Sequence, residues 1–170
     1  MKHFKRVVLV SILVVSSLLT AGAEKRLAPS GGTMPQLEFV MQLKVTLGEA
    51  YTVGDTPRGR RMVVPITGGT FRGPQLQGSI VPGGADWQLV SADGKRTELE
   101  AIYSIKTDDG HYIHIRNRGI IAPGYFKAAP QFEAPADSPY GWLNNALFVC
   151  EPDFSTKDFK GIVLNVWKIK

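Results

Sequence analysis

Cysteine is almost absent from this sequence, in which Cys150 is the only one. A single cysteine cannot form a disulfide bond within the chain, so the fold has to be stable through its hydrophobic core. Cys150 lies in the apolar run "LFVC", where a thiol is more often a small buried hydrophobic group than a nucleophile. We therefore predict that Cys150 is buried and structural.

Helical periodicity is scarce too, because beyond residue 36 no segment of ten or more residues keeps a convincing helical period. Residues 37–47 instead alternate apolar and polar side chains, which predicts a β-strand. The apolar face of this strand consists of Leu37, Phe39, Met41, Leu43, Val45 and Leu47.

Short strand patterns continue along the rest of the chain. They are "RMVVPIT", "QLQGSIV", "DWQLVS", "TELEAIYSIK", "HYIHIR" and "GIVLNVWKI". Glycine-containing loops or turns are expected between them, at residues 54–61, 82–84, 92–95, 108–110 and 117–119. Strands at intervals of about ten residues predict an all-β fold, either an antiparallel sandwich or a barrel.

Phosphate-binding loops are missing, although six glycines lie between Gly68 and Gly84. A Walker loop needs a lysine and a hydroxyl residue after its last glycine, whereas Pro74 and Gln75 follow Gly73. A dinucleotide-binding loop needs a helix after it, whereas a strand pattern follows here. Glycines inside strands permit bulges and bends, which strongly curved sheets require. The glycines therefore favour a single small closed barrel over a flat sheet.

Histidine is scarce as well, since only His111 and His114 occur beyond residue 23. On a strand, a separation of three residues places two side chains on opposite faces, which argues against a shared metal site. The G-x-S-x-G pattern of many serine hydrolases is absent. We therefore predict no metal and no cofactor.

The first 23 residues are predicted to form the helix of a secretory signal peptide. Two lysines and an arginine precede the apolar residues 7–19, which are too few for the ~20 residues of a comfortable membrane span. Ala21-Gly22-Ala23 offers the small residues of a cleavage site, so we predict cleavage after Ala23 and export to the periplasm or the medium. The alternative is an uncleaved signal that anchors the chain.

Excess positive charge is small in the chain that remains after such a cleavage. Three of the 20 lysines and arginines leave with the signal, so that 17 basic residues face 15 acidic ones and the net charge is +2. No basic stripe with interleaved aromatic residues is present, so nucleic acid is not an expected partner. The expected partner is a small-molecule ligand. Contact with a membrane is expected only if the signal stays uncleaved. The chain could also form a homo-oligomer, which the sequence does not decide.

Three segments follow from these patterns: a signal at 1–23, a flexible leader at 24–36 and a β-barrel domain at 37–170. Within the barrel domain, residues 122–139 carry four prolines and three aromatic side chains. A disordered loop would rarely hold so many aromatic residues, so we predict an ordered, partly extended flap that packs on the barrel. The stretch "SPYGWLNN" is expected to add one short helical turn.

Several long motifs resemble one protein family. They are "RRMVVPITGGTFRGPQLQGSIVPGGADWQLV", "LEAIYSIKTDDG", "YFKAAPQFEAP" and "SPYGWLNNALFV". Together they resemble the bacterial and fungal family called domain of unknown function 3237, also uncharacterised protein family 0311, from about Leu37 to the end of the chain. The resemblance implies a single small antiparallel β-barrel and no particular activity. Ile102 and Lys127 depart from the family pattern, in which arginine is usual at both positions, and this puts a shared anion-binding role in doubt.

Four neighbouring strand patterns each have a polar face, which either lines the lumen of the barrel or faces solvent. Leu99, Ala101, Tyr103 and Ile105 share one face of their strand, and Glu98, Glu100, Ile102 and Ser104 share the other. In the lumen arrangement, Asp86, Glu100 and His114 converge in a pocket. Any positive charge that compensates the carboxylates then comes from Arg116 or Lys127. The residues predicted to bind the ligand are Asp86, Trp87, Glu100, His114, Arg116 and Trp142, with Tyr103 and Tyr125 as further apolar walls.

Three functions compete on this evidence. The first is an exported barrel that binds a small, partly aromatic or carbonyl-bearing molecule in its lumen. The second is a lyase or isomerase that acts by proton transfer without a cofactor, with Asp86 or His114 as the base and Tyr112 as an acid. The third is a structural protein of the cell envelope without a small ligand.

Overall fold

The computed structural model describes residues 34–156 and 159–170. The predicted signal at 1–23 and most of the predicted leader lie outside these residues. No helix in the described part of the chain is long and apolar enough to span a membrane.

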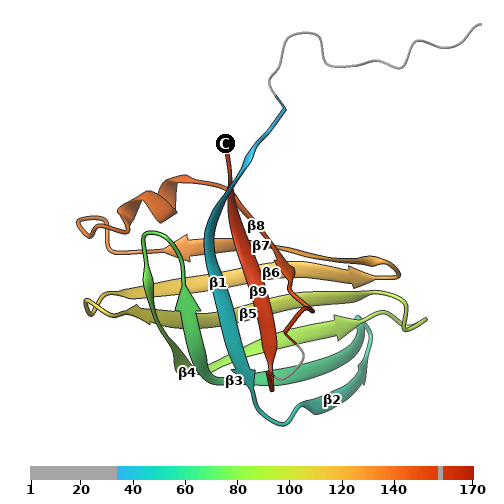
Figure 1. Cartoon of the computed structure of the whole chain (residues 1–170). Helices are drawn as coiled ribbons and strands as arrows, with labels where there is room; N and C mark the ends of the chain where they lie inside the picture. The colour runs from blue at the N-terminus through green and yellow to red at the C-terminus, as the bar shows by residue number, and fades with distance from the viewer. Residues whose placement is uncertain (1–33, 157–158) are drawn as a thin grey trace, which may run out of the picture. The chain divides into compact units, whose positions relative to one another are not determined.

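Antiparallel strands in the described residues wrap into a closed barrel (Figure 1). Their hydrogen-bonded order is β1-β9-β8-β7-β6-β5-β4-β3, and β1 pairs again with β3, so that eight strands close on themselves. A further strand, β2, pairs with the start of β3. The bounds are β1 Leu37–Leu47, β2 Tyr51–Thr56, β3 Gly59–Arg72, β4 Gln77–Val90, β5 Thr97–Thr107, β6 Tyr112–Ala122, β7 Tyr125–Glu133, β8 Phe148–Pro152 and β9 Ile162–Ile169. The predicted all-β antiparallel barrel is confirmed.

Strand β1 follows its predicted alternation only in its second half. Met41, Leu43 and Val45 are buried, but Phe39 is exposed and lies edge-on against Trp167. The pairing of β1 with β9 shifts between Phe39 and Met41, where a β-bulge puts one extra residue into β1. The prediction that all six apolar side chains share one face is therefore wrong, because the bulge turns the first residues away from the core.

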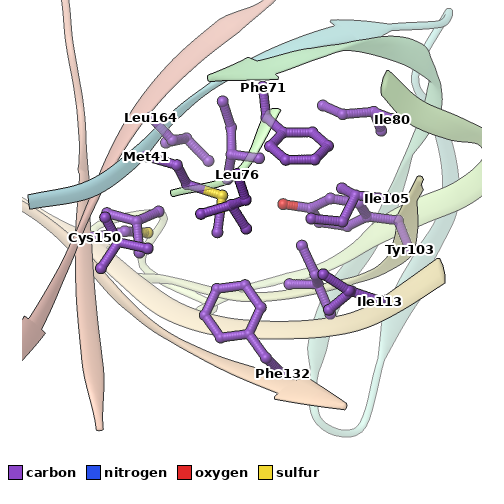
Figure 2. Close-up of a cluster of buried hydrophobic side chains, with 14 of the residues drawn as sticks. Met41, Phe71, Leu76, Ile80, Tyr103, Ile105, Ile113, Phe132, Cys150 and Leu164 are labelled. Atoms are coloured by element: carbon purple, nitrogen blue, oxygen red, sulfur yellow. The ribbon is translucent and has the colours of Figure 1, made fainter. Parts of the chain in front are cut away.

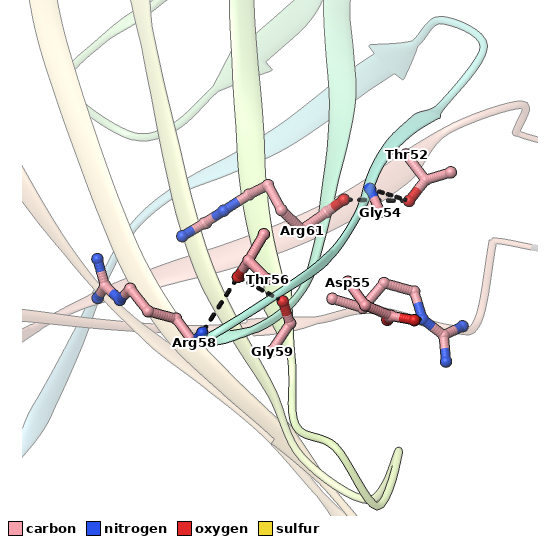
Figure 3. Close-up of polar contacts among 8 residues, drawn as sticks. Thr52, Gly54, Asp55, Thr56, Arg58, Gly59 and Arg61 are labelled. Atoms are coloured by element: carbon pink, nitrogen blue, oxygen red, sulfur yellow. Dashed lines mark hydrogen bonds and ion pairs between the residues drawn. The ribbon is translucent and has the colours of Figure 1, made fainter.

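Three predicted loops or turns are parts of strands instead. Residues 82–84 lie inside β4, and residues 117–119 lie inside β6, which ends only at Ala122. Most of the loop predicted at 54–61 is a hairpin of β2 and β3 (Figure 3). In its turn the Thr56 hydroxyl donates to the carbonyl of Gly59 over 2.7 Å and accepts a hydrogen bond from the backbone N–H of Arg58.

The predicted flap at 122–139 is wrong for most of its length. Residues 125–133 form β7, which pairs with β6 along its whole length and belongs to the barrel wall. The chain leaves the barrel after Glu133 and forms the short 3₁₀ helix η1, Gly141–Asn145, which confirms the predicted helical turn. Pro130 is tolerated in β7 because this strand shares only one residue pair with β8, so that one edge of the strand is largely unpaired.

The hydrophobic core lies inside the barrel and extends to the end that η1 covers. Leu143 of η1 is buried against this core. Phe132 and Phe148 pack edge-to-face there, with their ring centroids 4.8 Å apart. Figure 2 shows large side chains from several strands meeting at the barrel axis. They include Met41, Phe71, Leu76, Ile80, Tyr103, Ile105, Ile113, Phe132, Cys150 and Leu164.

Candidate functional site

The luminal cavity adjoins this core and extends toward the β6–β7 turn, where Ile121 and Phe126 line it. Its volume is ≈ 150 Å³ and most of its walls are aliphatic or aromatic. Four polar side chains from the central wall of the barrel also line it. They are Asp86 and Gln88 of β4, Tyr103 of β5 and Asn117 of β6. The apolar lining comes from Val45, Leu47, Val64, Ile66, Leu99, Ala101, Ile121, Phe126, Ala128, Ile162 and Leu164.

Asp86 is the only carboxylate among the described residues that line this cavity. The side-chain amide of Gln88 donates to its Oδ2 over 2.8 Å, and the backbone N–H of Glu100 donates to its Oδ1 over 2.9 Å. Burial raises the pKa of Asp86 above the ordinary aspartate value of 3.8, and the two hydrogen bonds oppose this rise. No lysine or arginine of the described residues forms an ion pair with it.

Strand β4 places Asp86 inside although its pairing with β5 is irregular between Val81 and Ala85. Ile80 points into the core and pairs with Ile105, and Asp86 pairs with Ala101, which lies on the same face of β5 as Ile105. Because directly paired residues share a face, Asp86 also points inward. Gln77 and Ser79 have the opposite parity and are exposed. The polar face of the first half of β4 is therefore exterior, and the polar face of the second half is luminal.

The polar side chains nearest to Asp86 on the inner face come from the neighbouring strands β5 and β6. Asp86 pairs with Ala101 of β5, and Ala101 pairs with Asn117 of β6, so these three side chains form one row on the inner face. Tyr103 stands in the adjacent row, paired with Ile115. Both Tyr103 and Asn117 are almost fully buried.

Cys150 lies beside this row, and the prediction that it is buried is confirmed. Its exposed fraction is 1%, and its Sγ accepts a hydrogen bond from the amide nitrogen of Asn117 over 3.3 Å. Burial raises the pKa of the Cys150 thiol to about 11, so the thiol stays neutral at physiological pH. Cys150 does not line the cavity.

Replacing Cys150 by serine should lower the stability of the protein by about 1–2 kcal/mol, because a hydroxyl is more costly to bury than a thiol. Chemical denaturation measures this loss. A thiol reagent should label the native wild type only slowly, at the rate of local or global opening. Rapid labelling under native conditions would show that the side chain is accessible.

The predicted convergence of Asp86, Glu100 and His114 is wrong. Glu100 lies on the outer face of β5, where Arg118 donates to its carboxylate over 2.9–3.0 Å and Arg116 approaches within 3.8 Å. His114 lies on the outer face of β6, with its Nδ1 3.4 Å from the Ser104 hydroxyl. The reason is parity, because the inward face of β5 and β6 is the apolar one.

Three further predicted ligand or proton-transfer residues also lie away from the cavity. Trp87 follows Asp86 and so faces outward, with 37% of its surface exposed. Tyr112 is exposed, with the ammonium group of Lys106 over its ring. Trp142 of η1 packs against Phe148 near the opposite end of the barrel.

Arg116 and Lys127, the two residues predicted to compensate the negative charge of the carboxylates, also lie outside the cavity. Arg116 is exposed beside Glu100, and Lys127 forms an ion pair with Glu151. Ile102, which departs from the family pattern, pairs with Arg116 on the outer face and borders a shallow groove with Trp87 and His114. An arginine at position 102 therefore belongs to the exterior of the barrel and not to the lumen.

The sequence reasoning missed Gln88 and Asn117 as cavity residues. The alternation of residues 86–89 already places Gln88 on the same face as Asp86, but Gln88 was not among the predicted ligand-binding residues. Asn117 was missed because residues 117–119 were expected to form a turn, whereas in the extended strand it has the same parity as Ile113 and Ile115 and is a polar side chain on an otherwise apolar face. Tyr103 was expected as an apolar wall and does line the lumen.

Fold and site together define a small closed β-barrel in which the described residues line a largely apolar lumen with one carboxyl group and a few neutral polar groups. Residues 35–125 match the family model described as "Protein of unknown function (DUF3237)". The chain belongs to this family.

Relatives and solved structures agree with this assignment. A UPF0311 protein of Clostridium acetobutylicum is 36% identical over 132 residues, which cover 66% of this chain and 82% of that protein. A β-barrel-like protein of Acinetobacter baumannii has a crystal structure that superposes with a TM-score of 0.72 at 30% identity, covering 84% of this chain and 100% of the other. The hydroalkoxylation enzyme phnH of Penicillium herquei is 31% identical over 113 residues, 66% of this chain and 71% of that enzyme.

Proposed function

We propose that the barrel binds a small, largely apolar, partly aromatic molecule in its lumen and transfers a proton on it through Asp86. The observation that carries the proposal is the position of the Asp86 carboxyl in a largely apolar cavity, with two hydrogen-bond donors and no ion-pair partner among the described residues. Acidic groups with a raised pKa in a cavity are typical of general acid–base catalysis.

The size of the cavity limits the ligand. A volume of ≈ 150 Å³ corresponds to about ten water-sized positions, so the lumen suits a molecule of about ten non-hydrogen atoms. Its aliphatic and aromatic walls favour a molecule with a hydrocarbon or ring body. A single aromatic ring with a short side chain meets both requirements.

The similarity to a hydroalkoxylation enzyme supports a redox-neutral reaction. Hydroalkoxylation adds an O–H group across a C=C bond. In this reaction the neutral carboxyl of Asp86 protonates one alkene carbon, the hydroxyl oxygen of the substrate bonds to the other carbon, and the hydroxyl proton returns to the carboxylate. The alkene π bond and the substrate O–H bond break, and one C–H and one C–O bond form, so Asp86 ends as it began.

The test uses 2-allylphenol, an aromatic molecule of suitable size that carries both a hydroxyl group and an alkene. The purified barrel should convert it to 2-methyl-2,3-dihydrobenzofuran above the uncatalysed rate, as followed by gas chromatography. If the molecule binds in the lumen but no conversion occurs, the barrel is a binding protein for this class of compound. If no aromatic compound of this size binds, the proposed function is wrong.

Export of the chain is a separate proposal, which rests on the sequence of its first 23 residues. After expression in a bacterial host, the mature protein should be found outside the cytoplasm with Glu24 at its N-terminus. Mass spectrometry of the fractionated protein measures this. An intact N-terminus in the membrane fraction would indicate an uncleaved anchor instead.

A further inference from the structure

The hydroxyl group of Tyr103 lacks a hydrogen-bond partner among the described residues. The side chain is 96% buried, and Figure 2 shows its oxygen pointing toward the middle of the barrel. Buried polar atoms without a partner are rare in native proteins, and each needs an explanation such as a bound water or another group. Tyr103 is one of the residues that line the luminal cavity, so a ligand of this cavity is such a group. Because burial raises the pKa of Tyr103, the phenol stays neutral and can donate its hydrogen.

Asn117 offers a second donor on the same wall. Its amide nitrogen carries two hydrogens, and its one hydrogen bond in the described structure goes to the Sγ of Cys150. Since Ala101 pairs with Asn117, and Tyr103 lies two residues after Ala101 on the same face, Tyr103 and Asn117 are diagonal neighbours. Diagonal neighbours on one face of an antiparallel pair lie about 7–8 Å apart at Cα. Both side chains line the cavity.

We propose that the Tyr103 hydroxyl and the Asn117 amide form a two-donor subsite for an oxygen acceptor of the luminal molecule, a carbonyl oxygen in the first place. This inference rests on the proposed function, because it names the substrate class of the same cavity. The ligand is then an aromatic or other apolar body with one carbonyl group, whose oxygen lies at Tyr103 and whose neighbouring carbons lie toward Asp86.

The placement has a chemical consequence. Two donors that converge on a carbonyl oxygen stabilise negative charge on it, as donors in oxyanion sites do. Asp86 stands in the row next to Tyr103 and on the same row as Asn117. A ligand bound by its oxygen therefore presents its adjacent carbon atoms to the one luminal carboxyl group.

Two probes of nearly equal shape test the subsite. Benzaldehyde carries a carbonyl group where styrene carries a vinyl group, and both suit a cavity of ≈ 150 Å³. The wild type should bind benzaldehyde at least about tenfold more tightly than styrene, as measured by NMR titration. Contacts from the probes to the methyl groups of Ala101 and Ala128 should place both in the lumen.

Tyr103→Phe removes only the hydroxyl group. It should reduce the preference for benzaldehyde to about twofold or less while styrene binds as before. Without a probe, its melting temperature should equal or exceed that of the wild type, because no protein hydrogen bond is lost. Tyr112→Phe is the matched control, since it removes a hydroxyl from an exposed tyrosine and should leave the preference unchanged.

The other possible outcomes contradict the proposed subsite, and they show whether luminal binding fails with it. If the wild type binds both probes in the lumen equally well, the subsite is refuted and luminal binding stands. The same holds if Tyr103→Phe keeps the preference. If neither probe enters the lumen of the folded wild type, luminal binding of such molecules and the subsite fail together.

Discussion

Replacing Asp86 by asparagine should abolish turnover of 2-allylphenol, with a loss of at least about 100-fold in kcat, while the probe still binds. The asparagine keeps the shape of the side chain but cannot donate and regain a proton in the way a carboxyl group does. The factor corresponds to the usual contribution of one general acid–base group. Steady-state kinetics measure kcat and KM, and KM should change little.

The same variant should be as stable as the wild type or more stable at neutral pH. The folded state raises the pKa of Asp86 above 3.8, so between 3.8 and the raised value it binds more protons than the unfolded chain. The contribution of Asp86 to the free energy of unfolding therefore falls as the pH rises through this interval. The difference in stability between Asp86→Asn and the wild type should grow over the same interval and then level off.

Asp137→Asn is the matched control, because Asp137 is exposed and lies outside the cavity. It should change both activity and stability little, by no more than about 0.5 kcal/mol in stability. If Asp86→Asn keeps full activity, another group transfers the proton and the proposed role of Asp86 is wrong. If it destabilises the fold strongly at neutral pH, its hydrogen bonds outweigh the burial of its charge.

Replacing Gly69 by alanine should destabilise the barrel by at least about 4 kcal/mol, a large part of the 5–15 kcal/mol typical of a whole domain. Gly69 pairs with Val45 where β1 and β3 close the barrel. A Cβ atom at this position would overlap the backbone carbonyl of Lys44, and the backbone φ of +130° disfavours any side chain. Chemical denaturation should show a lower midpoint, and the β1–β3 pairing should exchange its amide hydrogens faster.

Gly83→Ala separates these two causes. Gly83 has a similar φ of +108°, but nothing lies within 4 Å of a Cβ atom there. Its cost should be limited to the strained backbone, about 1–2 kcal/mol. Equal losses in the two variants would mean that the backbone conformation, and not the close approach of β1 and β3, makes glycine necessary at Gly69.

The wall formed by β4, β5 and β6 carries the functional argument because its inner face combines one carboxyl group with neutral donors. Asp86, Tyr103 and Asn117 come from the three neighbouring strands β4, β5 and β6, and the register of these strands brings them together on the inner face. The outer face of the same wall is polar and charged, with the Glu100–Arg118 pair in solvent. Charge substitutions at Glu100 or Arg118 should therefore leave the luminal chemistry almost unchanged.

Local features of the sequence determined much of the fold. The alternation in residues 37–47 and the spaced strand patterns indicate an all-β protein, since a side-chain period of two is a property of each strand by itself. The glycines between Gly68 and Gly84 indicate sharp curvature, because close backbone approach leaves no room for a Cβ atom. Burial of Cys150 also follows from its apolar neighbours alone.

Only the tertiary structure decided which polar face points inward. Parity groups Glu100 with Glu98, and Asp86 with Gln88, but it does not say which group faces the barrel axis. That choice depends on how β4 pairs with β5 beyond the irregular residues 82–84. Asp86 pairs with the inward-facing Ala101, whereas Glu100 and His114 lie on the outer faces of β5 and β6. The reason is that the direction of a side chain is set by pairing with strands far away in sequence, which no local pattern records.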